Sequence, residues 1–77
     1  MKPINMIEIN PRVCGGTPVI CGTRIPVSVL LGQLASGESW AGLRAGYPEL
    51  TDAAISAALL FAKRSIEHSE FDFAEAI

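Results

Sequence analysis

Glycine and proline residues cut the helix-favouring part of this chain into three short segments, and this punctuation limits the fold more than any other feature. Pro26 suits the first turn of a helix, where its missing N–H costs little. Gly37 fits a left-handed helix cap, and Gly46 with the turn at 47–50 ends a second segment. The predicted helices are at about 27–36, 39–46 and 51–68.

Apolar side chains recur within the three segments at the spacing of a single helical face. In the first two segments these residues are Val27, Leu30, Leu31, Leu34, Trp40 and Leu43. In the third segment the predicted core stripe is Ile55, Leu59, Ala62 and Ile66. Ser39 and Thr51 precede the second and third helices, where a side-chain oxygen can accept from free backbone N–H groups. We therefore expect both residues to be N-caps.

The N-terminal third of the chain is extended rather than helical. Residues 6–9 have the pattern of a short strand, and residues 18–21 and 24–27 flank a glycine-containing turn, which is typical of a β-hairpin. Because Pro26 cannot donate a ladder hydrogen bond, the return strand is short or lies at an edge. The predicted fold class is mainly α: a helix-turn-helix-like bundle of three helices preceded by a short β-hairpin at about 6–26. One domain at 1–68 and a tail at 69–77 are expected.

Charge separates the body of the chain from its C-terminal end. Residues 1–66 contain six Lys and Arg against four Asp and Glu, a net charge of +2, whereas residues 67–77 contain four acidic residues and no Lys or Arg, a net charge of −4. The tail alternates acidic and apolar residues, which is typical of a segment that orders on a partner. The candidate partner-binding residues there are Phe71, Asp72, Phe73 and Ile77. The alternative is that Phe71 and Phe73 fold back on the domain's own core.

Residues that could support catalysis or metal binding are scarce. The single histidine, His68, falls near the end of a charged helix without the partners that a catalytic triad needs. Cys14 and Cys21 are expected to be reduced and buried as small hydrophobic residues. They are not expected to bind zinc, because a zinc site needs about four ligands. The glycines at 15–16 lack the Lys-Ser/Thr pair of a phosphate-binding loop. We expect no enzymatic activity, no metal and no cofactor.

The order of helices resembles the arrangement that places a recognition helix in the major groove of DNA. The candidate DNA-binding residues are Arg24, Arg44, Thr51, Ser56, Lys63 and Arg64. The start of the third helix offers Thr51, Asp52 and Ser56, which is a weak set, because Arg, Asn and Gln make the strong contacts to bases. Lys63 and Arg64 come about two turns later, where they suit backbone phosphate.

Leu60 and Phe61 fall outside the predicted core stripe of the third helix. This apolar surplus indicates that the helix also packs against a second chain, so both residues are candidate oligomer contacts. The alternative is that the N-terminal hairpin covers them within one chain.

A long, ordered set of motifs distinguishes this chain. It comprises Asn10-Pro11, Gly15-Gly16-Thr17-Pro18-Val19-Ile20, Gly22-Thr23-Arg24-Ile25-Pro26-Val27, Leu30-Leu31, Leu34-Ala35-Ser36-Gly37, Tyr47-Pro48-Glu49-Leu50-Thr51 and Ile55-Ser56-Ala57-Ala58-Leu59. Over about residues 4–68, this set closely resembles a widespread prokaryotic family of domains of unknown function, DUF433. The resemblance implies a homeodomain-like three-helix fold preceded by a small β element.

The resemblance also implies the role of antitoxin in a type II toxin–antitoxin pair, whose toxins look like PIN-type ribonucleases, metal-dependent enzymes with acidic sites. The chain departs from the family in its second helix, where Gly42 and Gly46 replace more usual acidic, helix-favouring residues. An interior glycine costs roughly 0.5–1 kcal/mol relative to alanine. Within the family motif we expect Arg24 to tie backbone carbonyls or a carboxylate at the end of the hairpin; contact with a phosphate or a partner is the alternative.

The expected function is therefore that of an antitoxin that binds and neutralises a PIN-like ribonuclease as a homo-oligomer, a dimer, with operator DNA left open as a second partner. A stand-alone helix-turn-helix DNA-binding regulator and a structural oligomerisation module are the alternatives. No membrane partner is expected, because no apolar run approaches roughly 18 residues. The N-terminus lacks the apolar core of a signal peptide, so the expected location is the cytoplasm.

Overall fold

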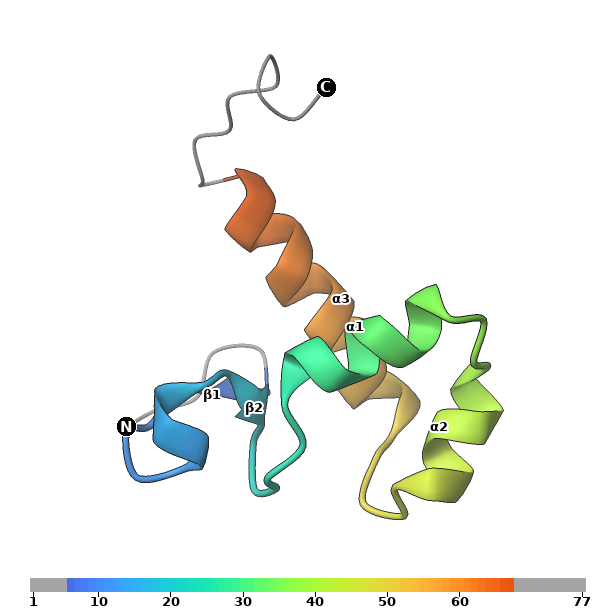
Figure 1. Cartoon of the computed structure of the whole chain (residues 1–77), viewed down its shortest axis with the longest axis horizontal. Helices are drawn as coiled ribbons and strands as arrows, with labels where there is room; N and C mark the ends of the chain where they lie inside the picture. The colour runs from blue at the N-terminus through green and yellow to red at the C-terminus, as the bar shows by residue number, and fades with distance from the viewer. Residues whose placement is uncertain (1–5, 68–77) are drawn as a thin grey trace.

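The structure, a computed structural model, describes residues 6–67 and contains a small antiparallel sheet followed by three helices (Figure 1). The elements are β1 Ile7–Glu8, β2 Val19–Ile20, α1 Val27–Ala35, α2 Trp40–Gly46 and α3 Asp52–Glu67, with a 3₁₀ turn at Cys14–Gly16 before β2. The predicted fold class, mainly α with a short N-terminal hairpin, is confirmed.

Backbone hydrogen bonds show why α1 stops where the sequence predicts. Gly37 has φ +96°, a left-handed conformation that glycine adopts without steric cost. Its N–H donates to the carbonyl of Leu34 at 3.0 Å, and the N–H of Glu38 donates to the carbonyl of Gln33 at 2.9 Å. This pair of bonds is a Schellman motif, which satisfies two carbonyls at the end of the helix. It also turns the chain sharply into α2.

The predicted caps of the other two helices are present. The Ser39 hydroxyl accepts from the N–H of Gly42 at 3.0 Å, and the Thr51 hydroxyl accepts from the N–H of Ala54 at 3.1 Å. The carboxylate of Glu38 lies close to Gly42, where it occupies the space that a Cβ would take. That carboxylate accepts from the N–H of Ser39 at 2.9 Å, so the start of α2 is held by two side chains.

The hairpin is smaller than predicted and pairs differently. The strand expected at 6–9 is limited to β1, which pairs with β2 so that Ile7 lies opposite Ile20. The return run at 24–27 is not a strand: it contributes one isolated bridge between Val19 and Pro26. The turn between β2 and this run is stabilised by Thr23. Its hydroxyl donates to the Ile20 carbonyl at 2.8 Å and accepts from the Ile25 N–H at 3.0 Å.

The expectation that both cysteines are buried is wrong. Cys14 and Cys21 are free thiols and both are exposed. Each lies in a turn rather than on a core-facing strand: Cys14 starts the 3₁₀ turn with φ +51°, and Cys21 directly follows β2. A turn on the surface leaves the side chain in solvent whatever its hydropathy.

The core lies where the sheet, α1, α2 and the first half of α3 meet. Its buried members are Ile7, Ile20, Ile25, Val27, Leu30, Leu43, Leu50, Ala54, Ile55, Ala57 and Ala58. The predicted α3 stripe is correct at Ile55, which is 0% exposed, but wrong at Leu59 and Ile66, which are 39% and 58% exposed. The face that α3 buries is instead lined by alanines, because small side chains let two helices approach closely.

Candidate functional site

The C-terminal part of α3 from Leu59 to Glu67, called its second half below, carries large apolar side chains that the described part of the chain leaves exposed. The helix runs past α1, and its C-terminal turns project away from the body of the domain (Figure 1). Leu59, Leu60 and Ile66 are 39%, 38% and 58% exposed. We call these three residues the α3 apolar surface. Exposed apolar side chains gathered on one short helical stretch are typical of a surface that binds another protein segment.

An apolar groove adjoins this surface. One wall is formed by Pro18, Val27 and Leu31, and the other by Phe61, Ala62 and Ile66. The groove, called the α1–α3 groove below, has a volume of about 310 Å³, near the lower end of the range for small-ligand pockets. It is therefore large enough to take a few apolar side chains.

Leu60 and Phe61, the predicted oligomer contacts, have different environments. Phe61 is half-buried, packs against the core and forms part of the α1–α3 groove. Leu60 remains exposed and does not line the groove. The domain itself therefore partly covers Phe61, whereas Leu60 stays exposed; contact of either residue with a second chain stays a prediction.

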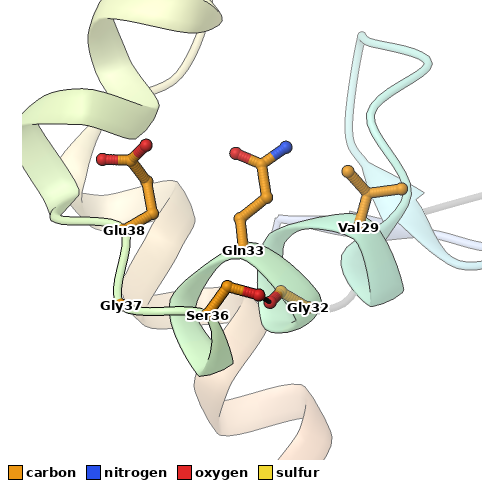
Figure 2. Close-up of a pocket in the computed structure, with 6 residues that line it drawn as sticks. All are labelled: Val29, Gly32, Gln33, Ser36, Gly37 and Glu38. Atoms are coloured by element: carbon orange, nitrogen blue, oxygen red, sulfur yellow. Dashed lines mark hydrogen bonds between the residues drawn. The ribbon is translucent and has the colours of Figure 1, made fainter.

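A second, more open hollow lies at the corner between α1 and α2 (Figure 2), with a volume of about 590 Å³. Gln33 and Glu38 extend beside it, with Val29 at its far end. Their polar groups already have partners: the Gln33 amide donates to the Tyr47 hydroxyl at 3.2 Å, and the Glu38 carboxylate accepts from the Ser39 N–H. These groups hold the helix corner together, so this hollow is a weaker candidate for ligand binding.

Two of the predicted DNA-binding cations are paired within the domain. Arg44 at the end of α2 forms an ion pair with Asp52 at the start of α3. Lys63 Nζ lies 2.6 Å from Glu67 Oε2, one turn along α3. Both pairs are exposed, where an ion pair contributes about 0–1 kcal/mol and can open for a stronger partner.

Within the described residues, Arg24 makes none of the contacts expected of its guanidinium. Its side chain is exposed, and the guanidinium makes no hydrogen bond or ion pair to any residue in 6–67. Thr23, its neighbour, ties the hairpin end instead. Arg64 is likewise exposed and has no such partner in that range. Both guanidinium groups remain able to contact a phosphate or a carboxylate from outside the described part of the chain.

The six DNA-binding candidates come from separate elements: Arg24 precedes α1, Arg44 lies in α2, and the other four lie at the start of α3 or along it. Thr51 and Arg44 lie near the start of α3, but the Thr51 hydroxyl is used as a cap and Arg44 is paired. Ser56 is exposed one turn further on. Lys63 lies about 18 Å from Thr51 along the helix axis, at a rise of about 1.5 Å per residue.

The predicted partner-binding residues Phe71, Asp72, Phe73 and Ile77 lie outside the described residues, as does His68. Among residues 6–67, no three His, Cys, Asp or Glu side chains are grouped so that they could hold a metal ion. No helix in that range is long and apolar enough to cross a membrane.

Sequence patterns missed the exposure of Leu59 and Ile66. Both residues continue the spacing of Ile55, which is buried, and hydrophobic spacing alone cannot show where the neighbouring elements end. A usable signal was the cluster of alanines at 53–54 and 57–58, which marks close helix packing and a different buried face.

These elements define a small three-helix domain with an N-terminal β-hairpin and an apolar, projecting last helix. The chain belongs to the family described as "Protein of unknown function (DUF433)", whose model matches residues 7–62. The resemblance found in the motifs is thereby confirmed.

A solved structure of a DUF433 member from Anabaena variabilis is similar, with a TM-score of 0.76 and 41% sequence identity. The match covers 82% of this chain and 62% of that one, so this chain spans less than two thirds of the length of that relative. No protein with a curated description matches this chain.

Proposed function

We propose that this protein is the antitoxin of a type II toxin–antitoxin pair and neutralises its toxin by binding it through the C-terminal half of α3 and the tail that follows. The α3 apolar surface carries the proposal, because three large apolar side chains lie exposed on one helical stretch. The partner class, a PIN-like ribonuclease, comes from the resemblance described above. A protein partner would bury Leu59, Leu60 and Ile66.

A protein partner accounts for this surface better than DNA does. A nucleic-acid site requires cations near the start of the recognition helix. The start of α3 offers Thr51 and Asp52 instead, and the nearby Arg44 of α2 is already paired with that aspartate. Large apolar side chains gain nothing from phosphate, whereas a protein interface core is built from them. Charge and hydropathy on α3 therefore favour protein binding as the primary activity.

The test is co-expression of the chain with the adjacent reading frame of its genome, followed by affinity purification and a growth assay. The adjacent product should co-purify with this chain, and the chain should restore growth that the product alone suppresses. The double variant Leu59→Ser/Leu60→Ser should weaken binding by at least tenfold. The matched control is Val29→Ser, a change at an equally exposed apolar residue of α1, 38% exposed, which should bind like the wild type.

Deletion of residues 69–77 separates the contribution of the tail from that of the helix. Partner binding should be lost while the far-ultraviolet circular dichroism of the helices persists. Absence of any co-purifying adjacent product, with no rescue of growth, would contradict the antitoxin role. Equal loss in the Val29→Ser control would mean that the surface on α3 is not the binding site.

DNA binding is the second candidate, favoured by the exposed Arg24 and Arg64 and by the order of the helices. An electrostatic complex with the chain's own promoter should weaken steeply as salt rises. Arg24→Ala and Arg64→Ala should each reduce the slope of that salt dependence by about one. A flat mobility-shift titration at low salt would exclude this activity. A homodimer formed through the α3 apolar surface would instead appear in sedimentation equilibrium of the chain alone.

A further inference from the structure

We infer that the α1–α3 groove is the anchor point of the proposed interface and that it takes an aromatic side chain from an acidic segment of the toxin. The inference rests on the proposed function and deepens it, because it names the chemistry of the segment that the partner presents. It also extends the interface from α3 to the start of α1, which the α3 apolar surface does not include.

The groove is continuous with the α3 apolar surface. Ile66 belongs to both, since it lines the groove and is 58% exposed. Ala62 has the smallest side chain of the α3 wall, so it leaves room that a larger residue would fill. A few anchor side chains that fill pockets of this kind supply most of the binding energy of a protein interface. The groove is therefore the place on this surface where a partner side chain can be enclosed.

The walls of the groove favour an aromatic anchor over a polar one. Pro18, Val27 and Leu31 face it from one side, and Phe61 is held on the other by its packing against the core. Aromatic side chains bury a large apolar area and pair favourably with another ring. The Ser65 hydroxyl also lines the groove, but it donates to the Phe61 carbonyl at 2.9 Å within the helix. A polar anchor would lose its water for little return.

The charges beside the groove indicate an acidic partner. The α1 helix contains no Asp, Glu, Lys or Arg. On α3, Lys63 is paired with Glu67, whereas Arg64 is exposed and makes no hydrogen bond or ion pair to any residue in 6–67. Arg64 comes three residues after Phe61, so the two side chains are neighbours on the helix surface. An Asp or Glu beside the partner's aromatic residue would complement this guanidinium.

A second copy of this chain suits the same surface less well. A closed two-fold contact places one patch against the same patch of the other copy. Lys63 and Arg64 of the two copies would then approach each other, and like charges across an interface cost free energy. An acidic segment of a different protein gains from these cations instead.

The experiment measures the affinity of the adjacent gene product for variants of the full chain by isothermal titration calorimetry. Ala62→Leu fills the groove and should weaken binding by about tenfold or more, because the anchor is excluded. The matched control is Ala53→Leu, which adds the same bulk at an exposed position of α3 outside the groove and should bind like the wild type. Urea unfolding establishes that both variants are folded.

Two results of this titration would overturn the inference in different ways. Equal affinity of the folded Ala62→Leu and Ala53→Leu variants would exclude the groove as the anchor point and leave the antitoxin role intact. Absence of a complex with the wild-type chain would overturn the proposed function and the inference together.

Substitution of Arg64 tests the acidic character of the partner and does not depend on whether Ala62→Leu folds. Arg64→Glu should weaken binding by about tenfold at low salt, whereas Arg64→Lys keeps the positive charge and should retain most of the affinity. The difference should shrink at about 1 M salt, where the screening length is about 3 Å. Unchanged affinity of Arg64→Glu at low salt would contradict the inference.

Photo-cross-linking identifies the occupant of the groove in the complex. Ile66→photo-leucine places a reactive group of similar bulk in the groove wall. It should link to a toxin peptide in which Phe, Tyr or Trp lies beside Asp or Glu. A linked peptide without an aromatic residue, or no link in a complex that forms, would overturn the inference. A link between two copies of this chain would assign the groove to a second copy and would overturn it as well.

Discussion

The two halves of α3 are built on one continuous helix but have opposite relations to the rest of the molecule. The first half buries Ala54, Ile55, Ala57 and Ala58, whereas no residue of the second half is fully buried and Ile66 is 58% exposed. Apart from Ile55, the first half buries only alanines, and the second half holds larger residues at Leu59, Leu60 and Phe61. The first half is therefore packed closely against its neighbours, whereas the second half leaves apolar side chains exposed.

The largest expected difference between the halves comes from removing equal apolar bulk at Ile55 and at Leu59. Ile55→Ala should lower the free energy of unfolding by about 2–5 kcal/mol, since it leaves a cavity at a fully buried position. Leu59→Ala, at 39% exposure, should cost less than about 1 kcal/mol. Urea unfolding followed by circular dichroism measures both. Equal losses would show that the second half of α3 is packed as firmly as the first.

Adding bulk should give the next largest effect. Ala58 is 0% exposed at the crossing with the other helices, so Ala58→Leu should destabilise the fold by about 1–3 kcal/mol through overpacking. Ala62 lies one turn later on the wall of the α1–α3 groove, where open volume can accept a larger side chain. Ala62→Leu should therefore be close to neutral in the same unfolding experiment. A cost at Ala62 similar to that at Ala58 would mean that the groove is already filled.

Much of this fold could be predicted from local chemistry. Gly37, Ser39 and Thr51 act on backbone groups within a few residues, so the sequence pattern that marks them is complete in itself. The family was likewise identifiable, because its motifs are local and ordered along the chain.

The exposed face of α3 and the pairing of β1 could not be predicted in this way. Whether Leu59 is buried depends on where α1 and the hairpin end in space, and no spacing within α3 contains that information. Pairing of Ile7 with Ile20 likewise joins segments separated by the 3₁₀ turn. Sequence reasoning assigned the end of the hairpin to Arg24, whereas the hydroxyl of its neighbour Thr23 both donates to the Ile20 carbonyl and accepts from the Ile25 N–H, which a guanidinium cannot do.

Substitution of the N-cap residue Thr51 tests how much the start of α3 contributes to the stability of the helix. Thr51→Ala removes the acceptor for the Ala54 N–H and should cost about 1 kcal/mol. Thr51→Ser keeps a hydroxyl at the same position and should retain most of the stability. A loss in Thr51→Ser as large as that in Thr51→Ala would mean that the hydroxyl does not stabilise the helix start.

The smallest expected effects concern two exposed ion pairs, one at the start of α3 and one at its C-terminal end. Arg44–Asp52 joins two helices, so its coupling reports the attachment of the first half to α2. Lys63–Glu67 lies within α3 at i and i+4, so its coupling reports the helix alone. Because both pairs are exposed, double-mutant cycles with alanine should give about 0.2–1 kcal/mol for the first and about 0.3–0.5 kcal/mol for the second.

The two coupling energies should be similar in size, but the single substitutions at Arg44 and Asp52 should differ in their cost. Asp52→Ala alone should cost more than Arg44→Ala alone, since Asp52 also meets the positive end of the α3 dipole. Both couplings should fall when salt is raised to about 1 M, where the screening length is about 3 Å. An Arg44–Asp52 coupling of zero at low salt would contradict the view that this ion pair ties the first half of α3 to α2.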